Sequence, residues 1–126
     1  MPIKKVLIAD DQLYIQVFVE RVFKKEFNFS VSKALNGVEA LSKYDEDKPD
    51  IIFLDVSMPH MNGFEFLKEL RNVRKDKTTP VVIMTANRNS QLFSQLIQLG
   101  VTDYLLKPFT YALLKDRMTE IVDKAE

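Results

Sequence analysis

Two patterns of apolar and polar positions alternate along the chain. Short, mainly apolar runs are followed by longer segments in which apolar residues recur every three or four places. The first pattern is typical of a strand covered on both faces, as in a parallel sheet, and the second is typical of an amphipathic helix. Strands are predicted at residues 6–9, 29–34, 51–54, 81–85 and 101–106.

Helices are predicted after each strand, because apolar residues at helical spacing define one face of each following segment. The expected core-facing residues are, helix by helix, Ile15, Phe18, Val19 and Val22; Val38, Leu41 and Tyr44; Phe66, Leu67, Leu70 and Val73; Leu92, Leu96 and Leu99; and Leu114, Met118, Ile121 and Val122. Asp11 is the expected cap of the first helix. The fourth is expected over residues 91–99 with Gly100 just past its end, and residues 45–50 are expected to form a charged loop.

The alternation of strands and helices predicts the fold class. It favours an α/β fold in which five parallel strands form a sheet with helices on both faces. Right-handed crossovers leave few arrangements, and the flavodoxin-like, doubly wound (βα)5 sheet with strand order 2-1-3-4-5 is the common one. We expect a single domain spanning residues 1–126, close to the commonest domain size.

Composition narrows the function classes. The 18 basic and 18 acidic side chains balance, so net charge gives no reason to expect nucleic acid or an anionic membrane as a partner. The chain has no Cys, which excludes disulfides, thiolate metal sites and Cys nucleophiles and favours a reducing, cytoplasmic location. Its apolar runs are too short to span a bilayer, so no membrane insertion is expected.

The central apolar run ends on a single carboxylate. Residues 51–63 read IIFLDVSMPHMNG, and Asp55 follows the four apolar residues of the predicted strand. Taken alone, Asp55 has two interpretations: it opens a turn, as Asp often does, or it lies at the ligand-binding edge of an open sheet.

Polar residues also end the other predicted strands. Asp10 and Asp11 follow the first strand, Thr85 ends the fourth, and Lys107 follows the fifth. Because the carboxyl ends of parallel strands meet at one edge, these residues and Asp55 are expected to cluster. Each pair of carboxylates would repel by about 4 kcal/mol at about 4 Å and an effective dielectric of about 20. Such a cluster needs a cation or binds protons, and oxygen donors without His or Cys suit Mg2+.

The same cluster predicts phosphoryl chemistry. A magnesium ion, the Lys107 ammonium and the Thr85 hydroxyl around one carboxylate would stabilise a phosphoryl group in transfer. Asp55 is then the expected nucleophile, and an aspartyl phosphate the expected product.

Four segments together resemble the response-regulator receiver domain of chemotaxis and two-component signalling. They are VLIADD, IIFLDVSMPHMNG, VVIMTA and DYLLKPF, and the resemblance covers essentially the whole chain. It implies a signalling switch rather than an enzyme. Asp55 would be the phosphoacceptor, taking a phosphoryl group from a histidine kinase or a histidine phosphotransfer protein.

The resemblance also implies roles for the surrounding residues. Asp11 would bind Mg2+ directly, Asp10 mainly through water, and Ser57 through its backbone carbonyl. The Thr85 hydroxyl and the Ala86 N–H would bind phosphoryl oxygens. Lys107 would pair with the phosphoryl group, and its bond to Pro108 is expected to be cis.

A switch surface is implied on the fourth helix, the fifth strand and the last helix. Tyr104 falls at the family's aromatic switch position, where the ring moves between exposed and buried states as Thr85 moves towards the phosphoryl group. Phe93 and Ile97 have two interpretations that the sequence leaves open. They either widen the core stripe of the fourth helix or form, with Tyr104, an apolar partner face.

Further alternatives remain at this stage. The rival function is a Mg2+-dependent phosphohydrolase with an Asp nucleophile, although Ser57 stands where such enzymes carry a second Asp. The sequence does not identify the downstream partner. It leaves open whether the chain is a stand-alone receiver or a piece of a longer regulator, and whether it is a monomer or a phosphorylation-dependent dimer. The basic residues Arg71, Arg74, Lys75 and Lys77 are expected to face solvent and complement a helix dipole, with a phosphate-binding patch as the alternative.

Overall fold

The sheet has the predicted order. The computed structural model describes residues 2–125, which contain a five-stranded parallel sheet in the order β2-β1-β3-β4-β5. The strands are β1 (Lys5–Ala9), β2 (Ser30–Ala34), β3 (Ile51–Asp55), β4 (Val81–Thr85) and β5 (Asp103–Leu106). Every residue of β3 and β4 is buried, as expected for strands covered on both faces. The fold is therefore the expected flavodoxin-like one.

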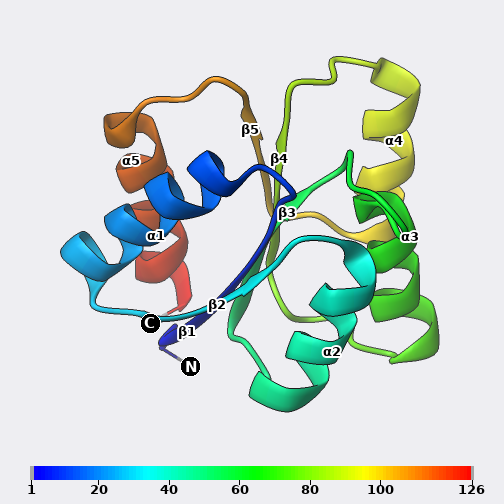
Figure 1. Cartoon of the computed structure of the whole chain (residues 1–126), viewed down its shortest axis with the longest axis horizontal. Coiled ribbons are helices and arrows are strands. Elements are labelled where there is room, and N and C mark those ends of the chain that lie inside the picture. Colours follow the sequence, from blue (N-terminus) through cyan, green and yellow to red (C-terminus); the bar gives the residue numbers. More distant parts are fainter. Residues whose placement is uncertain (1, 126) are drawn as a thin grey trace.

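Helices cover both faces of the sheet (Figure 1). They are α1 (Leu13–Phe27), α2 (Gly37–Asp47), α3 (Gly63–Lys68) with a π-helical continuation η1 (Glu69–Val73), α4 (Ser90–Leu99) and α5 (Tyr111–Ala125). One core cluster lies between the sheet and α1 with α5, and the second lies between the sheet and α2, α3 and α4. The carboxyl ends of the strands are left free of these two layers.

Several predicted boundaries are wrong. The helix α2 runs to Asp47, so the first three residues of the predicted charged loop are helical. The α1 N-cap is Gln12, not Asp11, because Asp10 Oδ1 already accepts the Gln12 N–H at 2.8 Å and the chain turns one residue later. Val38 is 55% exposed, because Gly37 and Ala40 form the buried side of that first turn.

The π-helical turn explains a further error on the third helix. The Arg74 N–H donates to the Glu69 carbonyl at 2.9 Å, an i to i−5 bond that widens the turn. The buried face is displaced after Leu70, so Val73 is 63% exposed and Arg71 turns inward to 4% exposure. The prediction that Arg71 faces solvent is therefore wrong. Lys75 and Lys77 are exposed as expected, and Arg74 pairs with Asp45 at 2.8 Å.

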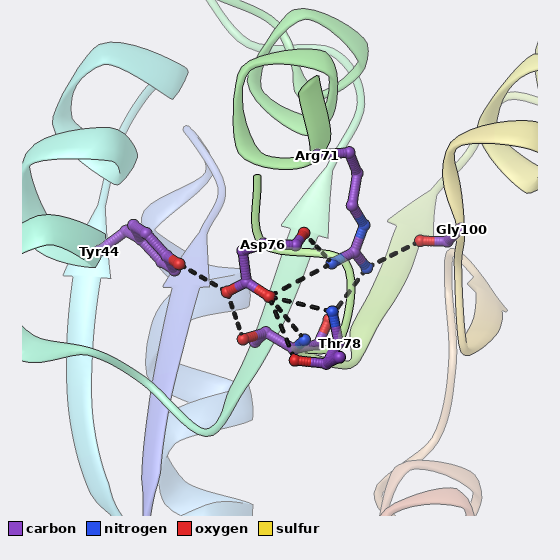
Figure 2. A network of polar contacts seen from close by, with 6 residues as sticks. Tyr44, Arg71, Asp76, Thr78 and Gly100 are labelled. Atoms are coloured by element: carbon purple, nitrogen blue, oxygen red, sulfur yellow. Dashed lines mark hydrogen bonds and ion pairs between the residues drawn. The ribbon is translucent and has the colours of Figure 1, made fainter. Parts of the chain in front are cut away.

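Arg71 anchors a polar network at the amino ends of β4 and β5 (Figure 2). Its guanidinium donates to the backbone carbonyls of Asp76, Thr79 and Gly100, each at 2.9 Å. The Asp76 carboxylate accepts from the Tyr44 hydroxyl at 2.5 Å, the Thr79 hydroxyl at 2.6 Å, and backbone amides including that of Thr79. With these carbonyls occupying the guanidinium, the phosphate-patch alternative also fails for Arg71.

Candidate functional site

The strand register brings the predicted site residues together. Ala9 pairs with Leu54, so Asp10 lies beside Asp55 at the ends of β1 and β3. Asp55 pairs with Met84, the neighbour of Thr85 in β4, and Thr85 pairs with Leu106, the neighbour of Lys107. Residues far apart in sequence therefore meet at one edge of the sheet because parallel pairing aligns their strand ends.

Three carboxylates form the centre of this edge. Asp10, Asp11 and Asp55 each offer an oxygen, and these oxygens lie within 4.8 Å of one another. Asp10 is fully buried and Asp55 is 4% exposed, whereas Asp11 faces solvent. Lys107 Nζ lies 2.8 Å from Asp10 Oδ2 and 3.6 Å from Asp55 Oδ2. One ammonium leaves an excess of negative charge, and this all-oxygen donor set fits a hard divalent cation such as Mg2+.

The environment of Asp55 raises the pKa of its carboxyl. Burial raises its pKa from 3.8 to about 6, and the negative charge of Asp10 adds to that effect. Lys107 and the backbone N–H of Ser57 act in the opposite direction but do not cancel it. A bound cation would favour the charged form by the same electrostatic rule.

A small cleft opens above Asp55. It has a volume of about 240 Å³. It is lined by Asp11, Gln12, Asp55, Ser57, Thr85, Ala86, Asn87 and Lys107. The residues predicted to bind the metal and the phosphoryl group thus share one cleft, except for Asp10, which lies beneath it.

Local sequence fixes the loop that follows Asp55. The Asn62 and Glu65 side chains form a capping box at the start of α3. Gly63 donates its N–H to the Val56 carbonyl at 2.9 Å, and a Cβ at Gly63 would lie only 2.3 Å from the Asp55 carbonyl oxygen. The close approach requires glycine there and holds the loop carrying Ser57 against the strand end.

The predicted switch residues are Thr85, which lines the cleft, and Tyr104 in β5. Thr85 is 1% exposed, and its Oγ1 accepts the Asn87 N–H at 3.0 Å. Tyr104 is half-buried; its hydroxyl donates to the Phe93 carbonyl at 3.3 Å, and the two rings are 4.6 Å apart. The Lys107-Pro108 bond is cis, as expected.

The two interpretations of the fourth helix are now distinguishable in part. Ile97 is 61% exposed and Leu96 is fully buried, so Ile97 does not widen the core. Phe93 is only partly buried and packs on the ring of Tyr104 in β5. These positions are compatible with a partner face, which stays a prediction.

Two glutamines were missed by the sequence analysis. Gln12 Oε1 accepts from Lys107 Nζ at 3.0 Å and lines the cleft. Gln16 is 5% exposed and lies on the inner face of α1 with Val19 and Phe23. A polar residue at i−3 from Val19, on a stripe that is otherwise apolar, is the signal that could have identified Gln16.

The chain matches a known family along most of its length. A sequence model described as "Response regulator receiver domain" matches residues 6–119. The chain is 36% identical over 121 residues to the Chemotaxis protein CheY of Listeria monocytogenes, covering 96% of this chain and 97% of that protein. None of the helices within residues 2–125 is long and apolar enough to cross a membrane.

Solved structures agree with the sequence match. The chemotaxis response regulator CheY4 of Vibrio cholerae superposes with a TM-score of 0.85 at 32% identity, covering 94% of this chain and 98% of that one. CheY of Borrelia burgdorferi, solved as a complex with CheX, BeF3 and magnesium, gives a TM-score of 0.84 at 29% identity. That match covers 94% of this chain and 88% of the other.

Proposed function

The chain belongs to the response regulator receiver family, and we propose that Asp55 is the residue at which it accepts a phosphoryl group. As a receiver domain it is a phosphorylation-activated switch of two-component signalling, and the phosphohydrolase alternative is not favoured. The observation that carries the assignment is the position of Asp55 in the cleft. It lines the cleft together with Thr85 and Lys107, whereas Asp10 is fully buried, is not part of the lining and pairs with Lys107.

The proposed step transfers a phosphoryl group from a phosphohistidine. An Asp55 carboxylate oxygen attacks phosphorus, the bond from phosphorus to the imidazole nitrogen breaks, and that nitrogen keeps the electron pair. The donor is a histidine kinase or a histidine phosphotransfer protein. The product is an aspartyl phosphate, so each chain carries one phosphoryl group, and we do not expect turnover of phosphomonoesters.

Asp10, Asp11, Asp55 and the Ser57 carbonyl would hold Mg2+ at the cleft. The bound ion would neutralise part of the negative charge that the carboxylates and the phosphoryl oxygens bring together. The Borrelia CheY complex contains magnesium together with BeF3, and this supports the same assignment for the present chain.

The remaining cleft residues would bind the phosphoryl oxygens. Lys107 Nζ lies 3.6 Å from Asp55 and supplies a positive charge to the group that forms there. Thr85 would turn its hydroxyl from the Asn87 N–H towards the phosphoryl group, and the Ala86 N–H would donate to a second oxygen. Tyr104 would then change its contact with Phe93, which alters the surface of α4, β5 and α5.

We propose further that this surface controls a protein partner, and that the chain acts in the cytoplasm as one receiver domain spanning residues 1–126. CheX accompanies CheY in the Borrelia complex. A partner of the present chain would bind the surface of α4, β5 and α5 differently before and after phosphorylation. The half-buried Tyr104 and the exposed Ile97 support a partner face at this position.

A labelling assay separates a switch from an enzyme. The protein is incubated with acetyl phosphate and Mg2+, and intact mass is followed with the release of phosphate. One phosphoryl group per chain, absent without Mg2+, is the expected result. Continued hydrolysis of phosphomonoesters at many turnovers per chain would contradict the proposal.

A further inference from the structure

One of the buried polar side chains in this fold belongs to neither of the two polar clusters described above. Within residues 2–125 these side chains are Asp10, Gln16, Asp55, Arg71 and Thr85. Asp55 and Thr85 line the cleft, Asp10 belongs to the same carboxylate site, and Arg71 belongs to the network at the amino ends of β4 and β5. Gln16 has no role in the chemistry proposed above, yet its burial requires that its amide be hydrogen-bonded.

The Gln16 carboxamide binds the ends of two strands. Its Nε2 donates to the Asp10 carbonyl at 2.9 Å and to the Ala34 carbonyl at 2.7 Å. Asp10 follows β1, and Ala34 is the last residue of β2. The side chain therefore joins the first turn of α1 to the sheet edge that carries the carboxylates.

The hydrogen bond from Gln16 to Asp10 acts on the backbone of the carboxylate site. The Asp10 carbonyl belongs to the peptide that links Asp10 to Asp11, so the Gln16 bond fixes the orientation of that peptide. The same residue is held at three other points, because its N–H donates to the Ala34 carbonyl at 3.0 Å, its Oδ1 accepts the Gln12 N–H at 2.8 Å and its Oδ2 accepts from Lys107 Nζ at 2.8 Å. Gln16 supplies a fourth restraint, which acts on the Asp10 carbonyl.

A carboxamide suits this position for chemical reasons. Two backbone carbonyls require two N–H donors, and the Gln NH2 group has two. A carboxylate of the same size would place a negative charge against both carbonyl oxygens, and an apolar side chain would leave the two carbonyls without these donors.

We propose that Gln16 is a positioning residue that orients the Asp10–Asp11 peptide for cation binding. This inference rests on the proposed function, because it concerns the same carboxylate site. Residues that orient metal ligands through hydrogen bonds change metal affinity when they are removed, even though they do not touch the metal.

The test compares Mg2+ binding to the whole chain with and without the carboxamide. Gln16→Met removes both donors and keeps an unbranched side chain of similar length. Calorimetric titration is expected to show a Kd for Mg2+ at least about tenfold higher than in the wild type. In the absence of metal, the Asp10 amide is expected to exchange its hydrogen faster.

The control variant is Tyr44→Phe, which removes a partly buried hydrogen bond at the amino ends of the strands. It is expected to lower stability and to leave the Kd for Mg2+ within about twofold. A Gln16→Met protein that binds Mg2+ as tightly as the wild type would overturn the proposal. If that variant does not fold, Gln16→Asn, whose carboxamide is too short to reach both carbonyls, is held to the same criterion.

The outcomes separate this inference from the function on which it rests. A wild-type protein that binds no Mg2+ would contradict the proposed function itself. A wild-type protein that binds Mg2+, with a Gln16→Met variant of equal affinity, would refute only the positioning role.

Discussion

Two polar clusters lie at opposite ends of the strands, one at their carboxyl ends (the carboxyl edge of the sheet) and one at their amino ends (the amino edge). They contain similar residues but differ in how their carboxylates are stabilised. Asp55 lies at the carboxyl edge and Asp76 at the amino edge, each near a cationic side chain. Burial raises the pKa of Asp55 to about 6, helped by the charge of Asp10. Burial also acts to raise the pKa of Asp76, but hydrogen bonds from Thr79, Tyr44 and the Thr78 amide outweigh it and hold that pKa well below its usual range.

The difference lies in how completely each carboxylate is hydrogen-bonded. Asp76 accepts bonds from three hydroxyls and two backbone amides, so its charged form is stabilised without any added ion. Asp55 faces two further carboxylates and one ammonium, and its charged form is left incompletely balanced. A balanced carboxylate stabilises the fold, whereas an unbalanced one is available to bind a cation and to react.

The largest expected effect comes from removing the cation of the amino edge. Arg71→Met leaves three carbonyls without their donor and Asp76 without its charged neighbour. The free energy of unfolding is expected to fall by about 3–5 kcal/mol, measured by denaturant unfolding. The exposed Lys75→Met is the control and is expected to change stability by less than about 0.5 kcal/mol. Equal losses in the two variants would show that the Arg71 network is not structural.

A second variant removes the charge of the carboxyl edge. Since the folded pKa of Asp55 is about 6 and its ordinary value is 3.8, the folded state binds the extra proton between these values, and stability falls as pH rises through this window. Above about pH 6 the charge costs about 3 kcal/mol, so Asp55→Asn is expected to be more stable than the wild type by up to that amount. The advantage is expected to vanish near pH 4. An advantage that stays constant with pH would contradict this account of Asp55.

The pH dependence of stability that arises from Asp76 has the opposite sign. Its folded pKa is depressed, so its contribution to stability is present above the ordinary pKa of 3.8 and is lost as pH falls further towards the folded value. Urea unfolding of wild type and Asp76→Asn across this acid range is expected to converge as pH falls. A stability difference between wild type and Asp76→Asn that grows as pH falls would contradict this expectation.

Magnesium should act on only one of the two edges. At a Mg2+ concentration 100 times its Kd, the wild type is expected to gain about 2.7 kcal/mol of stability. Asp11→Asn and Asp55→Asn should gain less, because each removes a carboxylate from the site. A full gain in both variants would place the ion elsewhere.

The smallest effect is expected at the rim of the amino-edge network. Tyr44→Phe removes one hydroxyl that donates to Asp76 and should cost about 1 kcal/mol. Phosphoryl labelling of this variant should equal that of the wild type. Reduced labelling would mean that the two edges are coupled.

The sequence predicts the carboxyl edge far better than the amino edge. Asp10, Asp55, Thr85 and Lys107 each follow or end an apolar run, and parallel pairing then brings them together without further information. Arg71 could not be placed in this way. Its inward turn depends on a π-helical widening that periodicity does not encode, and its three acceptors come from two loops, one before β4 and one before β5.

The glutamines show an intermediate case. Gln16 carried a signal, a polar residue on an apolar stripe, but its two acceptors depend on how α1 sits over β1 and β2. The prediction that Asp11 caps α1 is wrong for a related reason. The Gln12 N–H donates to the side chain of Asp10, the residue before Asp11. Sequence pattern thus predicts which edge carries the chemistry, while the side-chain hydrogen bonds that support it require the packed structure.

The most direct test of the central claim is the location of the phosphoryl group. Wild type, Asp55→Asn and Tyr44→Phe are treated with acetyl phosphate and Mg2+ and analysed by intact and peptide mass spectrometry. One phosphoryl group is expected in the wild type and in Tyr44→Phe, on the peptide containing Asp55, and none in Asp55→Asn. A phosphoryl group retained by Asp55→Asn at the wild-type level would contradict the claim.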